Sequence, residues 1–350
     1  MTDKPALLQE VADLEKKLDS VALPPELKEK TEAMIQRLSR MARYGEYSTE
    51  YEKISHYIDW VTNLPWDKRS QDILDLENAK KILDKNHYDL VQIKERILEY
   101  IAVLNLNFKK NESRLRAPIL CFVGLVGTGK TTIASSIAEA MGRKFARIPF
   151  GGLGDPLDLR GQSRLRADAE PGLIVKALRR AGTKNPVILL DEIDRVADES
   201  HSSIMGVLIE LLDPEQNSSF QDHFMDYPFD LSEVLFIATC NNTTNISVAV
   251  MDRLEPLQMP SYSDEEKITI GRDYILPKAL GESGLDRQTI QIAPDAWSKI
   301  VRPLGYDSGI RTLERTIYSL CRKVAKMVLQ GKERNFNLNA DNIKDFLPNW

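Results

Sequence analysis

The sequence predicts an α/β fold, a parallel β-sheet with crossover helices, to which helical segments are added at both ends. Between residues 117 and 260, short apolar runs alternate with stretches of helical periodicity, the pattern typical of strands joined by helices. One run, 117–123, leads into a glycine-rich turn and then into a helical pattern, the order that a phosphate-binding loop needs. Outside this region the periodicity is helical. We therefore expect three parts, 1–70, 71–260 and 261–350.

The first part is expected to consist of helices. Its apolar residues recur at spacings of four and three, which places them on one helical face: Leu7, Val11, Leu14 and Leu18. Pro24-Pro25 ends that helix, and further helices follow it. The segment is too short and too polar for an enzyme domain of its own, so we interpret it as a packing or protein-contact module.

The other two parts supply the sheet and a C-terminal helical region. After helices within 72–106, five strands are expected: 118–123, 145–150, 186–190, 234–239 and 255–259. Beyond residue 260 we expect three helices, a short segment and a last helix: 264–281, 294–303, 309–330, 335–338 and from Asp341. Gly331 should end the third of these helices, because glycine adopts the left-handed conformation at helix ends without strain.

The overall charge and the cysteines exclude several classes of protein. With 47 basic and 52 acidic residues the net charge is −5, so no overall positive field would draw the chain to nucleic acid or to an anionic membrane. No apolar run approaches about 18 residues, and the N-terminus lacks a signal-peptide core. We expect a cytoplasmic protein with three reduced, buried thiols: Cys121, Cys240 and Cys321.

The glycine-rich turn, Gly124-Leu-Val-Gly-Thr-Gly-Lys130-Thr131, has the spacing of a nucleotide-phosphate site. Its glycines allow a tight turn whose N–H groups converge on an anion, and the following helix adds the positive end of its dipole. Lys130 would bring a mobile charge to the phosphates, and the Thr131 hydroxyl would bind Mg²⁺. The alternative interpretation is a purely structural glycine turn.

Polar side chains end two later strands and could act on the same nucleotide. Asp191 and Glu192 follow the run 186–190, where a second Mg²⁺ group and a water-activating carboxylate would be placed. Asn241 ends the next strand and could position the same water. Acidic residues at a strand end can also be merely solvated, but the glycine loop favours the functional interpretation. Arg253 and Arg311, taken singly, could be ordinary surface charges.

Taken in order, these motifs resemble those of AAA+ ATPases, and most closely the ATPase module of Lon proteases. The order is GKT in the glycine loop, LLDEID, ATCN, DR and GIRTLER. Further segments with this likeness run through nearly the whole chain: 63–66, 74–83, 87–88, 94–100, 181–186, 212–220, 230–237 and 276–278. The resemblance implies a phosphate-loop α/β subdomain between the end of a Lon-like N-terminal region and a helical lid.

The resemblance also implies a role for each matching residue. Lys130 and Thr131 would bind phosphate and Mg²⁺. Asp191 would be the Mg²⁺ carboxylate, Glu192 the hydrolytic carboxylate, and Asn241 a first sensor of the nucleotide. The other residues implied to bind ATP are five of the loop and an adenine-packing pair: Gly124, Gly127, Thr128, Gly129, Thr132, His87 and Tyr88.

Two arginines complete the implied site. Arg311 would be a second sensor on the lid. Arg253 would be an arginine finger offered to the γ-phosphate of a neighbouring subunit. A finger supplied in trans implies a closed ring, by family likeness a hexamer.

The chain departs from the family pattern in three places. It stops at Trp350, before the family's Ser-Lys protease domain, so we expect an ATPase without proteolytic activity, either a fragment or a stand-alone relative. In the glycine loop, Leu125-Val126 replaces the usual Pro-Pro, which nucleotide binding should survive because the backbone carries it. Arg166-Ala167 stands where the family has the aromatic and aliphatic residues that grip substrate.

The altered loop leaves three interpretations open. Arg166 is a solvated charge on a loop that translocates nothing, or it belongs to a pore that threads polypeptide less tightly. In the third interpretation a ring grips an acidic polymer, protein or nucleic acid, through three arginines: Arg160, Arg164 and Arg166. No Phe, Tyr or Trp between Phe150 and Phe220 is present to stack with bases, which disfavours the third interpretation.

Two functional hypotheses follow. The first is a Mg²⁺-dependent ring ATPase that remodels or unfolds a protein partner, with no membrane partner. The second is a nucleotide-gated assembly or scaffold protein that binds ATP but scarcely hydrolyses it. A non-hydrolysing relative would not need all four of the catalytic residues, which favours the first hypothesis: Glu192, Asn241, Arg253 and Arg311.

Overall fold

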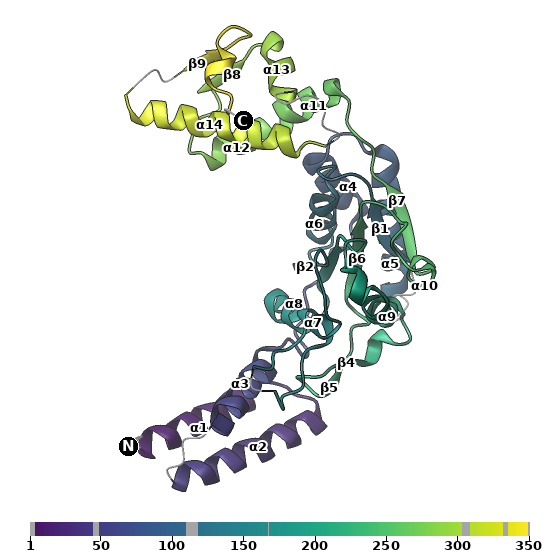
Figure 1. Cartoon of the computed structure of the whole chain (residues 1–350), viewed down its shortest axis with the longest axis vertical. Helices are drawn as coiled ribbons and strands as arrows, with labels where there is room; N and C mark the ends of the chain where they lie inside the picture. Colours follow the sequence, from purple (N-terminus) through teal and green to yellow (C-terminus); the bar gives the residue numbers. More distant parts are fainter. Residues whose placement is uncertain are drawn as a thin grey trace.

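Three parts follow one another along the long axis of the molecule, with the sheet in the middle (Figure 1). The computed structural model describes residues 4–44, 49–109, 118–166, 168–302, 309–331 and 335–348. The N-terminal helices lie at one end, below the sheet in Figure 1, and a second helical part lies at the other. This arrangement matches the predicted α/β core with helical additions.

The N-terminal part contains α1 (Lys4–Asp19), α2 (Pro25–Tyr44) and α3 (Thr49–Asn63). Pro25 is the first residue of α2, a position where its missing N–H has no cost. Val11, Leu14 and Leu18 of the predicted apolar face of α1 pack into a small core shared with α2 and α3, and the side chain of Leu7 lies outside the described part. Tyr57 and Trp60 of α3 instead join the core of the sheet. The helix α3 therefore connects the first part to the second.

The sheet contains all five predicted strands, each bound lying within one residue of its expected position: β1 (Ile119–Val123), β2 (Phe145–Pro149), β3 (Val187–Asp191), β6 (Leu235–Cys240) and β7 (Leu254–Gln258). The order is β2-β3-β6-β1-β7, and all neighbours are parallel. The prediction of a parallel sheet is confirmed. In this order the carboxyl end of β1 lies between those of β6 and β7, which positions the glycine loop.

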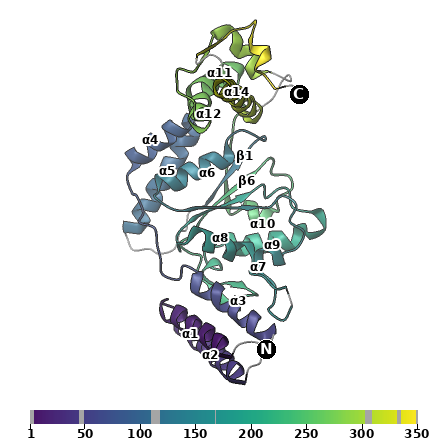
Figure 2. The same ribbon diagram turned by 90° about the vertical axis from the view of Figure 1, so that its left-hand side faces the viewer.

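Helices cover both faces of the sheet (Figure 2). One face packs against α4 (Leu76–Asn86), α5 (Val91–Lys109) and α6 (Lys130–Ala140), and the other against α8 (Leu173–Ala181) and α9 (His201–Leu212). Side chains of β1 alternate between these cores: Leu120 and Phe122 face the first, Cys121 and Val123 the second. A sheet buried on both sides explains why its strands are continuous apolar runs.

Two short helices and a hairpin complete the middle part: α7 (Leu157–Arg160), α10 (Val248–Met251), β4 (Phe220–Asp222) and β5 (Tyr227–Phe229). The antiparallel β4–β5 hairpin was not predicted. Its turn depends on Asp222, whose Oδ1 accepts hydrogen bonds from the N–H groups of Phe224 and Met225. Oδ2 of the same carboxylate accepts from the N–H of Gly172, which lies far away in the sequence.

The C-terminal part has its own hydrophobic core. It contains α11 (Asp264–Ile270), a π-helical turn (Gly271–Ile275), α12 (Leu276–Glu282), α13 (Trp297–Val301), α14 (Arg311–Leu329), β8 (Ile290–Ile292) and β9 (Phe336–Leu338). The expected helix 264–281 is therefore present as three consecutive segments. Gly331 follows α14 with a φ of 75°, as predicted for a helix end.

The helix expected from Asp341 is wrong. Residues Ile343–Asp345 form a single 3₁₀ turn, and Pro348, which has no N–H to donate, follows too soon for a longer helix. Asn339 Oδ1 accepts from the N–H groups of Asp341 and Asn342, and Asn342 Oδ1 accepts from the N–H of Asn339. Other 3₁₀ turns are Asp198–Ser200, Asn217–Ser219 and Pro294–Ala296.

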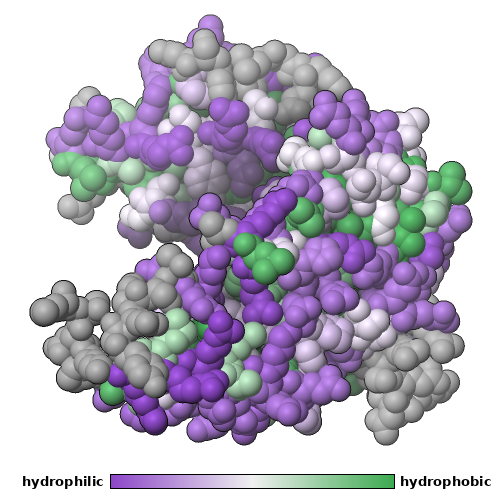
Figure 3. All heavy atoms as spheres, turned by 60° about the horizontal axis from the view of Figure 1, so that its bottom comes forward, coloured by the Kyte–Doolittle hydropathy of each residue, from purple (hydrophilic) through white to green (hydrophobic). Residues whose placement is uncertain are grey.

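The surface drawn in Figure 3 is mostly hydrophilic, with hydrophobic residues in small separate groups. Among the described residues, no helix combines the length and the apolarity needed to span a bilayer. All three cysteines are buried and free, as predicted from their positions.

Candidate functional site

The glycine loop between β1 and α6 has a backbone that fits a phosphate group. Gly127 and Gly129 have φ values of 84° and 94°, in the left-handed region that favours glycine. The N–H of Gly124 donates to the carbonyl of Cys240, 3.1 Å away on β6. A Cβ on Gly124 would lie 2.9 Å from the Cβ of Met259. Side chains at these positions would strain or displace the turn.

Lys130 begins α6, and its side chain turns back over the loop. Its Nζ donates to the carbonyls of Gly124 at 2.6 Å and Leu125 at 2.9 Å, and to Asn241 Oδ1 at 3.2 Å. Burial lowers the pKa of Lys130, and the negative charge of Asp191 opposes that shift. The structure therefore brings the predicted lysine, the predicted amide and the predicted carboxylate of β3 together.

Asp191, at the end of β3, is buried and has partners on both carboxylate oxygens. Oδ2 accepts from Arg147 Nε at 2.6 Å, and Oδ1 accepts from the hydroxyl of Thr239. Neither partner was predicted. Arg147 is a charged residue inside the apolar run of β2, which is the one signal that could have drawn attention to it. Thr239 carries no such signal.

Glu192 has a φ of 59°, which is uncommon for a residue other than glycine. Its N–H donates to Thr239 Oγ1 at 2.9 Å, and the N–H of Ile193 donates to the carbonyl of Thr239 at 3.0 Å. The side chain is 31% exposed, with Arg195 Nη1 3.6 Å from Oε2. Backbone strain of this kind occurs at functional sites, where the surrounding structure holds it. The turn leaves the carboxylate accessible at the end of the strand.

Asn241 follows β6 beside the glycine loop. Its N–H donates to Asp194 Oδ2 at 3.0 Å, and its Oδ1 accepts from Lys130. Its Nδ2 is buried and has no hydrogen-bond partner among the described residues. A buried donor without a partner costs about 1–3 kcal/mol, which a phosphate or water oxygen would offset.

The donor set around the loop fits a magnesium-bound triphosphate. Thr131 is partly buried on the first turn of α6, close to the loop. The Thr132 hydroxyl donates to the carbonyl of Gly129 at 2.8 Å, and the buried Thr128 hydroxyl donates to the carbonyl of Leu125 at 2.9 Å. In the described ranges no three His, Cys, Asp or Glu residues gather as a metal cage. Mg²⁺ at Thr131 and Asp191 would therefore take further ligands from phosphate and water, as it commonly does.

The C-terminal part touches the glycine loop directly. The N–H of Ile310 donates to the carbonyl of Gly127 at 2.9 Å, and a Cβ on Gly127 would lie 3.2 Å from the Cβ of Arg311. The hydroxyl of Tyr262 donates to the carbonyl of Thr128 at 3.3 Å. The exposed side chain of Arg311 thus starts beside the loop.

His87 and Tyr88 lie between α4, α6 and the C-terminal part. His87 Nε2 is 2.9 Å from Ser136 Oγ on α6. Burial lowers the pKa of His87 to about 4, and the ammonium of Lys94 adds to the shift, so the ring is neutral at neutral pH. The ring of Tyr88 meets that of Tyr274 edge to face, with centroids 6.3 Å apart. An adenine-packing role for the pair stays a prediction.

Arg253 stands apart from these groups. Its Nη2 is 2.9 Å from Asp213 Oδ2, and its Nη1 donates to the carbonyl of Ala249 at 2.7 Å. The hydrogen bond from Arg253 holds the pKa of Asp213 below its usual range. None of these partners belongs to the glycine loop, so the structure does not bring Arg253 together with Lys130 in the same chain.

Two of the three loop arginines have partners within the chain. Arg160 pairs with Glu210. The guanidinium of Arg164 lies 4.0 Å from the centroid of the Tyr57 ring and 3.7 Å from Asp226.

The tip of the same loop is open to solvent. Arg166 is exposed, and Leu165 is 92% exposed. Ala167, the other half of the predicted Arg166-Ala167 pair, lies outside the described residues. Leu165 thus places an apolar side chain at this tip, one residue before the predicted pair.

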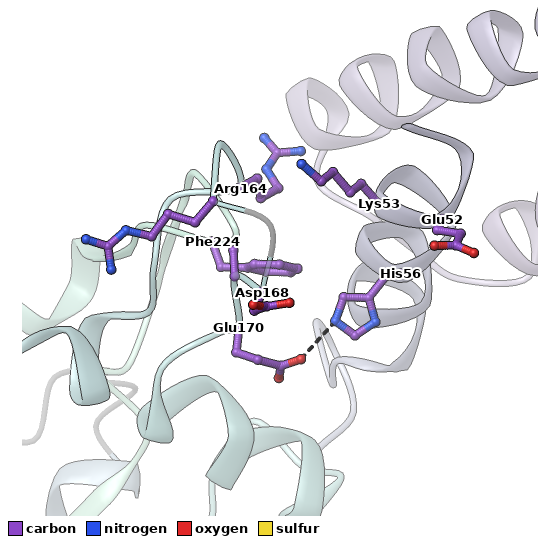
Figure 4. Close-up of a pocket in the computed structure, with 9 residues that line it drawn as sticks. Glu52, Lys53, His56, Arg164, Asp168, Glu170 and Phe224 are labelled. Carbon is purple, nitrogen blue, oxygen red and sulfur yellow. Dashed lines mark hydrogen bonds and ion pairs between the residues drawn. The ribbon is translucent and has the colours of Figure 1, made fainter. Parts of the chain in front are cut away.

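A cavity of about 570 Å³ separates this loop from α3 (Figure 4). His56 on α3 reaches across it, with Nε2 3.2 Å from Glu170 Oε1. The lining mixes both signs of charge, including Lys53 and Asp168. The cavity lies at the junction of the first and second parts, away from the glycine loop.

A phosphate-binding loop, carboxylates at the end of a neighbouring strand and a helical part in contact with the loop define the class of phosphate-loop ATPases. A model of the ATPase family associated with various cellular activities (AAA) matches residues 120–261. A model of the Lon protease AAA+ ATPase lid domain matches residues 281–336.

Curated relatives narrow the class. The Lon protease of Lawsonia intracellularis is 44% identical over 339 residues, which cover 97% of this chain and 40% of that protein. The Lon protease of Heliobacterium modesticaldum is 42% identical over 335 residues, 96% of this chain and 40% of that protein. Lon protease 1 of Bacillus subtilis is 40% identical over 345 residues, which cover 99% of this chain and 44% of that protein.

The chain belongs to the Lon protease family, of which it carries the AAA+ ATPase and lid regions. It spans 40% to 44% of the length of the three relatives named above. The resemblance found in the sequence is confirmed, and it supports an ATPase type of function.

Proposed function

We propose that this chain binds ATP with Mg²⁺ at the glycine loop and hydrolyses it. The observation that carries the proposal is the position of Lys130, whose ammonium contacts two loop carbonyls and Asn241. The carboxylates of Asp191 and Glu192 are close enough to act on its pKa. Positive and negative groups of this kind converge where a metal-bound triphosphate needs both.

Each group has a distinct task in the proposal. Lys130 and the loop N–H groups bind the phosphates, and Thr131 and Asp191 hold Mg²⁺, which when bound neutralises phosphate charge. Glu192 accepts a proton from the attacking water, and Asn241 orients that water. Arg311 senses the nucleotide from the lid, and the backbone contact of Ile310 with the loop transmits the difference.

Phosphate release by the purified chain tests the site. Glu192→Gln should lower turnover at least about 100-fold while ATP binding persists, because an amide accepts no proton. Glu199→Gln, at an exposed carboxylate in the next turn, is the matched control and should hydrolyse ATP normally. Turnover should also stop when Mg²⁺ is chelated. Wild-type turnover of Glu192→Gln, or of Lys130→Ala, would refute the assignment.

We also propose that the chain works as a ring, by family likeness a hexamer, that remodels a protein substrate. The three-part division 1–70, 71–260 and 261–350 and the trans role of Arg253 belong to this proposal. The partners of Arg160 and Arg164 within the chain oppose a grip on nucleic acid or another acidic polymer. Leu165, rather than an aromatic residue, would contact the substrate, because it is the exposed apolar side chain at the loop tip.

Unfolding of a tagged substrate protein tests the remodelling step. Leu165→Ser should abolish ATP-dependent unfolding and leave basal ATP turnover unchanged. Leu329→Ser, at another large apolar residue that is 89% exposed, is the matched control. If the wild-type protein hydrolyses ATP but unfolds nothing, and unfolding appears only in the Arg166→Tyr variant, the natural loop does not translocate protein.

A further inference from the structure

Two of the three buried thiols lie side by side beneath the candidate nucleotide site. Cys121 Sγ on β1 and Cys240 Sγ on β6 are 3.8 Å apart, and both side chains face the same core. The parallel register pairs Val123 with Cys240, so the two cysteines are diagonal neighbours on one face of the sheet. The third thiol, Cys321, belongs to the core of the C-terminal part.

The distance between the two sulfur atoms is longer than that of a disulfide bond. A disulfide has sulfur atoms about 2 Å apart, so the two thiols must approach by about 2 Å, which side-chain rotation and a small shift of the strand ends can supply. Diagonal neighbours on paired strands have Cα atoms about 7–8 Å apart, more than most disulfides span, so the ends of β1 and β6 must also move when the bond forms.

The hydrogen bond between the two sulfur atoms, in which either thiol can be the donor, makes them unequal. With Cys121 as the donor it lowers the pKa of Cys240. The same hydrogen bond and burial raise the pKa of Cys121. With that donor, Cys240 is the sulfur that reacts first, since the thiolate is the reactive form.

We propose that Cys121 and Cys240 are a redox modification site, at which a hydroperoxide forms a reversible disulfide that weakens nucleotide binding. The Cys240 sulfur attacks the O–O bond of hydrogen peroxide, which leaves a sulfenic acid on Cys240 and releases one water. The Cys121 sulfur then attacks the sulfenic sulfur, an S–S bond replaces the S–O bond, and the second water leaves. Two thiols are oxidised and one peroxide is reduced to two waters.

The disulfide would act on the nucleotide site through backbone atoms next to the cysteines. The carbonyl of Cys240 accepts the N–H of Gly124, the first glycine of the loop. The next residue, Asn241, contacts Lys130 through its side chain. Drawing β6 toward β1 shifts both contacts. Formation of the bond does not depend on the proposed ATPase function, but its effect on nucleotide rests on that function.

Peptide mapping of the full chain after treatment with hydrogen peroxide tests the bond itself. Mass spectrometry should find the peptides of Cys121 and Cys240 linked, and Cys321 still a thiol. If both cysteines remain thiols in the folded protein, or reach sulfonic acid without a linked peptide, the disulfide is refuted. The wild-type chain suffices for this measurement.

Binding of a fluorescent ADP analogue tests the effect. Oxidation should raise the Kd about tenfold, the effect of losing one hydrogen bond to a charged group, and dithiothreitol should reverse it. The Cys121→Ser variant should bind the analogue with the wild-type Kd both before and after peroxide treatment. The matched control Cys321→Ser should show the same rise in Kd on oxidation as the wild type. A linked peptide with an unchanged Kd refutes the effect on nucleotide. Absence of binding to the reduced wild type contradicts the proposed function instead, while the peptide map still decides the disulfide.

Discussion

Thr239 connects the two acidic residues of the candidate site through a single hydroxyl. Its Oγ1 donates to Asp191 and accepts from the N–H of Glu192, which has a left-handed backbone. The motif order indicates both acids, because they follow an apolar run. It does not indicate Thr239, because a threonine inside a strand is ordinary and its partners are 48 and 47 residues away. At the residue scale, the sequence therefore identified the two acidic side chains but not the hydroxyl group that orients them.

His87 should make stability depend on pH. Its pKa is about 4 in the folded chain and about 6.5 when unfolded, so the unfolded chain binds the extra proton first as pH falls. The free energy of unfolding should fall by about 2 kcal/mol from pH 7.5 to pH 5 through this residue. His87→Gln keeps a group for Ser136 but does not titrate, so urea unfolding of this variant should lack that decrease. Identical pH profiles for variant and wild type would contradict the prediction.

The segment that begins α14 is the element that ties the lid to the glycine loop. A Cβ on Gly309 would lie 2.5 Å from the carbonyl oxygen of Val126 and 2.9 Å from the Cα of Gly127. The contact is therefore made backbone to backbone, with no room for a side chain. Such a contact transmits small displacements, because neither partner can rotate away as a flexible side chain would.

Gly309→Ala should push the lid from the loop. The added methyl meets backbone atoms, so we expect a loss of about 1–3 kcal/mol in the free energy of unfolding and weaker nucleotide binding. Gly281→Ala, on α12 of the same lid, is the matched control, because a Cβ there has open space. That change should stabilise the chain by about 0.5–1 kcal/mol. Equal urea midpoints and equal affinities for the two variants would show that the contact has no such effect.

At the scale of the whole molecule, the three parts are joined in different ways. The N-terminal part shares the core of the sheet through α3 and Leu27 of α2, whereas the lid has a core of its own. The described contacts of the lid with the nucleotide side of the sheet include Ile310 with Gly127, and Tyr262 with Thr128. A lid with a separate core can move as a unit, which is the motion that the proposed remodelling needs.

Arg253 should make turnover depend on assembly. Its partner within the chain is Asp213, so a role in trans requires that a neighbouring subunit present its nucleotide to Arg253 in place of this pair. Turnover per chain should rise with protein concentration, and Arg253→Ala should lower the plateau on the order of a thousandfold with ATP affinity kept. Arg272→Ala, at an exposed arginine paired with Asp273, is the matched control. A dilute monomer that hydrolyses ATP at the full rate per chain would disprove the trans role.

The sequence by itself determined the five strands of the sheet, the glycine loop and the acids at the end of β3. These features are local: burial on both faces demands continuous apolar runs, and a tight phosphate turn demands glycines at fixed spacing. The family resemblance was likewise carried by motifs, and the comparisons confirm it.

Tertiary structure alone decided the hairpin and the partners of the site residues. The Asp222 carboxylate accepts from Gly172, Arg253 pairs with Asp213, and the sulfur atoms of Cys121 and Cys240 meet across two strands. Each of these contacts joins residues that are 40 or more positions apart. Periodicity and motif spacing describe only neighbours along the chain, so the partner that a side chain finds is settled when strands and helices pack.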